Sequence, residues 1–301
     1  MKVLISGASG FIGMPIVQAL TREGATVAGL SRKCQITETG SKIKWLNADL
    51  SQPTTYMKAV KAFAPETLIH LAWSDIPDYS FGKSFTNLAQ SLEFMSFVTS
   101  LECCRNIIVA GSCWEIEKRK GECKEDEEAR PTNDFTWSKN ALHSWLEMEC
   151  KRRELSLKWM RIFYSYGPRQ RSASLIPSIL DSLGKKELPK IKTPKHSNDF
   201  IFVDDIAEAF ARAVFLSSPE SGIFHLGSGV ATPVIEVCRI ADDIINGSTE
   251  ITEQIECECK DSGSTPNFWA DCTKIRSSLG WSANTSLREG IEKTWRWMTG
   301  S

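Results

Sequence analysis

The sequence predicts an α/β protein whose main body is a doubly wound parallel sheet, followed by a smaller, interleaved α/β lobe. Short apolar, β-branched runs alternate with stretches of helical period, which is typical of βαβ units in a parallel sheet covered by helices on both faces. A glycine-rich turn joins the first of these runs to the first helix. The regular alternation then changes after Tyr166-Gly-Pro168.

Residues 1–165 are expected to form the first domain, and their elements follow in chain order. The strands are short apolar or β-branched runs, expected at 3–5, 27–30, 43–46, 68–71, 107–110 and 157–162. The helices carry apolar residues at helical spacing and are expected at 11–23, 84–104 and 134–153. Parallel strands need crossover connections of this kind, so the order of elements supports a parallel sheet.

Residues 166–301 are expected to form the smaller lobe. Its expected helices lie at 175–183, 204–216, 232–245 and 287–297, and its expected strands at 199–203 and 222–226. We expect the segment 199–226 to return to the main sheet. The charged stretch 115–130 mixes both signs and is expected to be a solvated loop.

The composition excludes several classes of protein. A chain of 301 residues is long enough for two modest domains or one large α/β unit with a substantial core. Its 36 Lys and Arg residues balance 37 Asp and Glu residues, and no local basic stripe is present. Nucleic acid, a polyanion, is therefore not an expected partner.

Membrane insertion and metal binding are also not expected. The uncharged stretch 3–21 superficially suggests a signal peptide or membrane span, but its glycines and Pro15 break an apolar helix. The 10 cysteines lack zinc-site spacing and, without a secretion signal, are expected to be reduced thiols. The sequence thus predicts a soluble, cytoplasmic protein with no metal site.

The strongest single motif is Gly7-Ala-Ser-Gly10-Phe-Ile-Gly13, directly after the first strand. Glycines here allow a tight turn and let the backbone approach a pyrophosphate, which then lies on the unpaired N–H groups of the helix N-terminus. The motif predicts a dinucleotide site that includes Gly7, Ser9, Gly10, Phe11, Ile12 and Gly13.

The end of the second strand indicates which dinucleotide is bound. The chain reads Ser31-Arg32-Lys33 where an NAD enzyme holds a carboxylate on the ribose 2′-hydroxyl. Two cations and no carboxylate suit a 2′-phosphate, which favours NADP(H) over NAD(H). An ordinary basic surface turn is the alternative.

Further motifs follow in order along the chain. They are Asp49-Leu50, His70-Leu-Ala72, Asn87, Phe163-Tyr-Ser-Tyr-Gly-Pro168, Asn198-Asp-Phe-Ile-Phe-Val-Asp-Asp205 and Asp271-Cys-Thr-Lys-Ile-Arg276 with Leu279-Gly-Trp281. With these motifs the chain resembles the extended short-chain dehydrogenase/reductase family, in its nucleotide-sugar epimerase/dehydratase/reductase branch, over nearly its whole length.

The resemblance implies a Rossmann domain for NADP(H) at 1–165 and a nucleotide-sugar-binding lobe at 166–301. It implies further cofactor contacts from Asp49, Leu50, Leu71, Ala72, Trp73, Asn87, Lys139 and Phe163. It implies substrate contacts from Trp73, Trp114, Tyr164, Leu175 and Asn198. The family's Arg at the place of Asn198 is missing, which weakens any assignment of the diphosphate clamp.

The catalytic residues that the resemblance implies are a Ser and a Tyr-x-x-x-Lys motif. Ser112 and Lys139 stand at the family's positions, but Phe135 stands where the Tyr belongs. The family's Tyr phenol, with an unperturbed pKa near ~10, needs the Lys cation in order to exchange a proton near neutral pH. Phe cannot exchange a proton.

Three explanations of Phe135 stay open: a Tyr→Phe change introduced to trap a complex, a natural variant with another proton donor, or a binding protein that lost catalysis. Tyr79, Tyr164 and Tyr166 are the candidates for another donor. Each also fits a substrate-contacting or packing role.

The residues after Ser112 narrow the reaction that the resemblance implies. The family's dehydratases carry an Asp-Glu pair there, and its 3,5-epimerases carry a Cys two residues after the Ser. This chain has Cys113 and Trp114. Hydride transfer to a sugar ketone remains, and the likeness of Gly111-Ser-Cys-Trp-Glu115 to the family's 4-ketoreductases implies NADP(H)-dependent reduction of a dTDP-, CDP- or GDP-linked 4-keto-6-deoxy sugar. A 4-epimerase and a non-catalytic nucleotide-sugar or NADP binder are the alternatives.

A homodimer is also expected, because the helices at 84–104 and 134–153 match those through which family members often pair. Leu88, Leu92, Met95 and Thr99 lie at helical spacing and could form such a face. A stripe facing the protein's own core explains them equally well.

Overall fold

The computed structural model describes residues 1–32, 43–117, 120–216, 220–258 and 267–300. Its main body is a parallel sheet of seven strands in the order β10-β7-β5-β4-β1-β2-β3. These strands are β1 (Lys2–Ser6), β2 (Thr26–Ser31), β3 (Ile43–Asn47), β4 (Thr67–His70), β5 (Asn106–Ser112), β7 (Ser156–Ile162) and β10 (Gly222–Leu226). The predicted doubly wound parallel sheet is confirmed.

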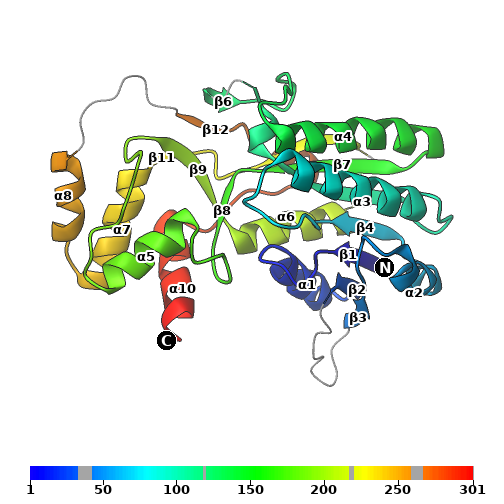
Figure 1. Cartoon of the computed structure of the whole chain (residues 1–301), viewed down its shortest axis with the longest axis horizontal. Helices are drawn as coiled ribbons and strands as arrows, with labels where there is room; N and C mark the ends of the chain where they lie inside the picture. The colour runs from blue at the N-terminus through cyan, green and yellow to red at the C-terminus, as the bar shows by residue number, and fades with distance from the viewer. Residues whose placement is uncertain (33–42, 118–119, 217–219, 259–266, 301) are drawn as a thin grey trace.

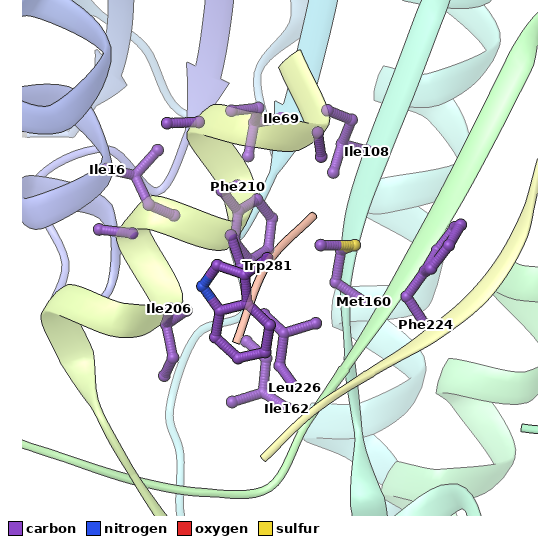
Figure 2. Packing of buried hydrophobic residues seen from close by; sticks show 14 of the residues in the cluster. Ile16, Ile69, Ile108, Met160, Ile162, Ile206, Phe210, Phe224, Leu226 and Trp281 are labelled. Atoms are coloured by element: carbon purple, nitrogen blue, oxygen red, sulfur yellow. The ribbon is translucent and has the colours of Figure 1, made fainter. Parts of the chain in front are cut away.

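Helices cover both faces of this sheet because its strands are apolar on both sides. One face packs on α1 (Gly13–Arg22) and α6 (Val203–Phe215), and Figure 2 shows Ile16 and Phe210 of these helices beside Ile69, Ile108 and Met160 of the strands. The other face packs on α2 (Met57–Phe63), α3 (Phe81–Thr99) and α4 (Asp134–Arg153). Figure 1 shows α3 and α4 side by side.

The smaller lobe has its own sheet and core. Strands β8 (Tyr164–Tyr166), β9 (Ser197–Phe202) and β11 (Ala231–Pro233) form a three-stranded sheet. It packs with helices α5 (Leu175–Gly184), α7 (Val234–Asn246), α8 (Glu250–Glu258) and α10 (Leu287–Thr299), which Figure 1 shows together at one end of the molecule. Within the segment 199–226, α6 and β10 lie in the main body, whereas β9 belongs to the lobe's sheet.

Two buried carboxylates join the C-terminal segments to the rest of the fold. Asp199 on β9 accepts hydrogen bonds from the backbone N–H groups of Ser228, Gly229 and Ala270 at 2.6 to 3.0 Å. Asp205 on α6 accepts from the N–H groups of Asn284 and Thr285, both at 3.1 Å. The motif at 198–205 therefore contains two carboxylates, Asp199 and Asp205, whose hydrogen bonds stabilise the fold.

The stretch 115–130 differs from the solvated loop that its charges suggest. Glu115 and Cys123 are buried, and β6 (Gly121–Cys123) pairs in parallel with β12 (Phe268–Ala270). A three-residue strand is too short to show a period, and its partner lies far along the chain, so the pattern of charges could not reveal it. The expectation of a solvated loop was wrong for these residues.

The possible dimer stripe on α3 faces the protein's own core. Leu88, Met95 and Thr99 are buried, and Leu92 packs against the same cluster. The sheet lies under this side of α3, so these positions do not form a dimer face. Within the described residues, no helix is long and apolar enough to cross a membrane.

Candidate active site

The topology places a pocket at the point where the sheet's winding reverses. From β1 the chain proceeds outward through β2 and β3, whereas β4, β5, β7 and β10 extend in the opposite direction. Ligands of doubly wound folds bind outside the carboxyl ends of the strands at such a point. A pocket of about 420 Å³ lies there. The predicted residues that line it are Gly7, Ser9, Gly10, Ser31, Arg32, Asp49, Leu50, Leu71, Ala72, Trp73 and Asn87.

The glycine-rich turn is closed as tightly as the motif predicts. Gly7 has φ +73°, and a Cβ on it would lie 2.9 Å from the backbone nitrogen of Ala72. A Cβ on Gly13 would lie 2.2 Å from the carbonyl oxygen of Gly7. Side chains are excluded at both positions, so the backbone itself forms this wall of the pocket. This cradle fits a dinucleotide pyrophosphate.

The end of β2 presents hydroxyls and a cation to the pocket. The Oγ atoms of Ser9 and Ser31 lie 3.1 Å apart, and Arg32 is exposed at the rim. The pKa of Asp49 is lowered by hydrogen bonds from Ser51, with a further contribution from the Arg32 charge. Lys33, the second predicted cation, lies outside the described residues.

Asn87 and His70 hold the wall formed by the end of β4. The Asn87 amide oxygen accepts from the Ser74 backbone N–H at 2.7 Å, and its NH₂ group donates to the Ser74 and Lys83 carbonyls. The His70 ring lies between the hydroxyls of Ser6 and Ser91, at 2.7 and 3.1 Å. Burial, with the Lys139 charge, lowers the pKa of His70 to about 3, so this ring is neutral.

Ser112 ends β5, and a buried carboxylate fixes its backbone. Glu115 accepts from the Ser112 N–H at 2.8 Å through Oε1 and from the Trp159 indole at 2.8 Å through Oε2. Arg161, also buried, donates to the same Oε2 at 3.3 Å. The Ser112 hydroxyl accepts from the Trp114 N–H at 3.2 Å. These hydrogen bonds fix the conformation of the turn that carries Ser112.

Lys139 reaches across from α4 to the end of β5. Its ammonium donates to the Ala110 carbonyl at 3.0 Å and lies 4.1 Å from the ring centre of Trp73. Burial lowers the pKa of Lys139 to about 8, and the Glu115 carboxylate opposes that fall. Its proton is therefore easier to move than that of an exposed lysine.

Phe135 stands in an aromatic wall made by Trp73, Tyr79, Trp114 and Phe135 itself. Its ring centre lies 5.6 Å from that of Trp73, edge to face, and 5.1 Å from that of Tyr79. The rings of Tyr79 and Trp114 lie 5.8 Å apart. These contacts connect Phe135 to Lys139 through the Trp73 ring, and to the Ser112 turn through the rings of Tyr79 and Trp114.

Residues 3–227 match the model of the NAD dependent epimerase/dehydratase family. The chain belongs to this family. Its members that resemble this chain have names that refer to nucleotide sugars. The recognition of a nucleotide-sugar branch from the sequence motifs is confirmed.

Three curated members of the family illustrate its range. The chain is 25% identical to a probable dTDP-glucose 4,6-dehydratase of Sinorhizobium fredii, over 99% of this chain and 92% of the relative. It is 26% identical to the UDP-glucose 4-epimerase of Mycolicibacterium smegmatis, over 98% and 97%. It is 25% identical to a dTDP-6-deoxy-L-talose 4-dehydrogenase (NAD(+)) of Aggregatibacter actinomycetemcomitans, over 76% and 85%.

A solved structure shows the same architecture. MoeE5 in complex with UDP-glucuronic acid and NAD superposes with a TM-score of 0.84 at 25% identity, over 100% of this chain and 99% of MoeE5. The family assignment and the fold therefore agree. The names of the relatives cover several reactions, so membership of the family does not by itself specify the reaction of this chain.

The lining of the pocket does not include the other predicted residues of this epimerase/dehydratase family member, among them Gly13, Ser112, Trp114, Phe135 and Lys139. Phe11 and Ile12 lead into α1 and are half-buried. Phe163 is buried in the main core, with its ring 5.3 Å from His225. Tyr164, Leu175 and Asn198 lie on β8, α5 and β9 of the smaller lobe. Tyr164 packs against Phe200 and Phe268.

Sequence reasoning missed Glu115, which the structure places under Ser112. The Ser-x-x-Glu spacing from Ser112 to Glu115 is the signature of a capping box, and the short helical turn Cys113–Glu115 is capped in this way. That spacing could have separated Glu115 from the exposed charges that follow it. Arg171 was also missed, because it approaches the Tyr79 segment only in the folded chain.

Proposed function

We propose that this family member reduces the keto group of a nucleotide-linked 4-keto-6-deoxy sugar with NADPH. The observation that carries the proposal is the arrangement around Ser112. Ser112 and Lys139 stand at the same end of β5, while Cys113 and Trp114 occupy the places where elimination would need a further acid and base. Such a site suits addition to a ketone better than elimination.

The pocket at the switch point is the proposed cofactor site. The turn at 7–13 would hold the pyrophosphate, and Asp49 and Leu50 would lie at the adenine. Ser31 and Arg32 would hold the 2′-phosphate, since β2 does not end in a carboxylate. When bound, the reduced nicotinamide supplies hydride to a carbonyl carbon. Lys139 would contact the nicotinamide ribose, and Ser112 would hydrogen-bond the sugar oxygen.

The sugar would lie against the aromatic wall. Trp73 and Trp114 are half-buried, so each has an exposed part that can pack on a pyranose ring. Tyr164, Leu175 and Asn198 of the smaller lobe are the proposed contacts to the nucleotide. The proposed substrate class is a dTDP-, CDP- or GDP-linked 4-keto-6-deoxyhexose.

The test is oxidation of NADPH, followed by absorbance, with a panel of dTDP-, CDP- and GDP-linked 4-keto-6-deoxy sugars. The chain as it stands and the Phe135→Tyr variant are measured in parallel. The variant places a phenol where the family carries its proton donor, and we expect it to oxidise NADPH with a member of the panel. The same panel with NADH checks the cofactor preference.

Two outcomes would contradict the proposal. Binding of the sugars without NADPH oxidation in either protein would support a non-catalytic binder. Inversion of a sugar 4-hydroxyl with tightly held NAD and no net oxidation of NADPH would support a 4-epimerase, the activity named for one of the curated relatives.

A further inference from the structure

Reduction of a ketone needs a proton donor as well as hydride, and Phe135 cannot be that donor. Within the aromatic wall, Tyr79 carries the one ionisable hydroxyl, and its ring lies against Phe135 on one side and Trp114 on the other. We propose that Tyr79 Oη donates the proton that completes the reduction. This inference rests on the proposed function.

The other three tyrosines are placed differently. Tyr56 is fully buried beside Phe94 and Phe97, in the core between α2 and α3. Tyr166 is buried in the smaller lobe, and its hydroxyl faces the Leu287 carbonyl at 3.4 Å. Tyr164 packs against Phe200 and Phe268. Tyr79 is the tyrosine that contacts the ring at position 135.

The segment that carries Tyr79 is anchored on both sides. Before it, Asn87 holds the backbone of Ser74, as described above, and Lys83 pairs with Asp75 at 2.8 Å. After it, the Ser84 hydroxyl of α3 donates to the Tyr79 carbonyl at 3.4 Å. A backbone held in this way keeps the Tyr79 ring in the aromatic wall, and a proton donor must be positioned in this manner.

A cation also lies close to the Tyr79 segment. The Arg171 guanidinium donates a hydrogen bond to the Ile76 carbonyl. Burial raises the pKa of Tyr79, so the phenol is protonated at neutral pH, and the Arg171 charge partly opposes that rise. Arg171 thereby favours the tyrosinate that forms after the proton has left.

The proton and electrons balance as follows. Hydride adds to the sugar carbonyl carbon, and the C=O π electrons move to the oxygen. That oxygen takes the proton of Tyr79 as the phenolic O–H bond breaks. The tyrosinate regains a proton from water, so each turnover consumes one proton from solution.

The first test removes the hydroxyl at position 79 and then introduces one at position 135. Tyr79→Phe is expected to lower the rate of NADPH oxidation by roughly 10²- to 10⁴-fold, the usual contribution of a general acid. Phe135→Tyr on the Tyr79→Phe background is expected to restore the rate, because the two rings are in contact. Tyr56→Phe, which removes a hydroxyl from a buried site in the core, is the matched control and should leave the rate unchanged.

The second test needs no cofactor. Tyrosine labelled with ¹³C gives one resonance set for each of the 4 tyrosines, assigned by substitution. Adding the product nucleotide sugar should shift the Tyr79 resonance and leave that of Tyr56 in place. The Kd of that product should be nearly the same for Tyr79→Phe, since the variant keeps the ring and loses the proton donor.

The outcomes separate this inference from the proposed function. Turnover by Phe135→Tyr with none by the chain as it stands would keep the reductase and overturn Tyr79 as donor. Full activity of Tyr79→Phe would also overturn it. No turnover by any variant, Phe135→Tyr included, would overturn the proposed function and the inference with it.

Discussion

Single residues set the shape of the pocket, and Gly7 shows this most directly. Its φ of +73° lies in the left-handed region, and the backbone of Ala72 fills the space where a side chain would project. Gly24 has a similar φ of +88°, but no atom lies within 4 Å of the place of its Cβ. Both positions would strain the backbone of a residue with a side chain, but only Gly7 would also bring that side chain into steric collision.

We therefore predict different effects for Gly7→Ala and Gly24→Ala. Gly24→Ala should cost about 1–2 kcal/mol in the free energy of unfolding, from strain alone. Gly7→Ala should cost about 1–3 kcal/mol more because of the collision. It should also weaken NADPH binding by about tenfold or more. Urea unfolding and NADPH titration measure both quantities, and equal losses in the two variants would contradict the prediction.

At the scale of elements, the outer side of α3 and α4 carries an aromatic patch made by Phe81, Phe85 and Trp137. Phe81 is 59% exposed and Phe85 50% exposed. Phe81 stacks on Phe85 at 5.7 Å and on Trp137 at 6.2 Å. An exposed aromatic cluster of this kind marks an interaction surface. We propose that a second copy of the chain covers it, which would make a two-fold pair of α3 and α4.

The double variant Phe85→Lys/Trp137→Lys is accordingly expected to be monomeric. Two charges on each side of a two-fold interface would face one another and lose their water on association. Light scattering of the unchanged chain should give the mass of a dimer. Trp297→Lys, which changes an exposed ring on α10 of the smaller lobe, should remain dimeric. A monomeric unchanged chain at micromolar concentration would refute the pairing.

At the scale of the whole molecule, buried histidines link stability to pH. Burial lowers the pKa of His70 to about 3, that of His143 to about 4 and that of His225 to about 3. In the unfolded chain these rings take up protons below about pH 6.5. The folded chain keeps them neutral, so the unfolded state binds more protons. Stability is therefore fully present above pH 6.5 and falls as the pH decreases.

We predict that each of these histidines lowers the free energy of unfolding by about 1.4 kcal/mol per pH unit below their unfolded pKa. The loss should begin near pH 6.5 and be steep by pH 5. His143→Phe, which keeps a ring against Trp159, should reduce the slope by about one-third. Urea unfolding at pH 7, 6 and 5 measures the slope. A stability that does not change over this range would contradict the assignment of buried neutral rings.

Local patterns predicted the seven strands of the main sheet and helices α1, α3, α4 and α6, but not α2. Strands β1 to β5, β7 and β10 have apolar runs or clear turns at their ends, and the helix predicted at 134–153 has the bounds of α4. The glycines of the turn, Gly7 and Gly13 among them, predicted where the pocket lies. The helix expected at 84–104 instead spans Phe81–Thr99, since helix ends depend on capping and on contacts outside the helix.

The sequence by itself determined the parallel sheet and the glycine turn, because each depends on the period or spacing of neighbouring residues, and the resemblance to the family singled out Ser112, Phe135 and Lys139. Only the tertiary structure decided that the side chains of Trp159 and Arg161 bind Glu115 and that Tyr79 packs against Phe135. Tyr79 and Phe135 lie on separate segments that meet only when α4 packs beside the segment leading into α3. Such contacts follow from packing across the whole molecule, which no local pattern records.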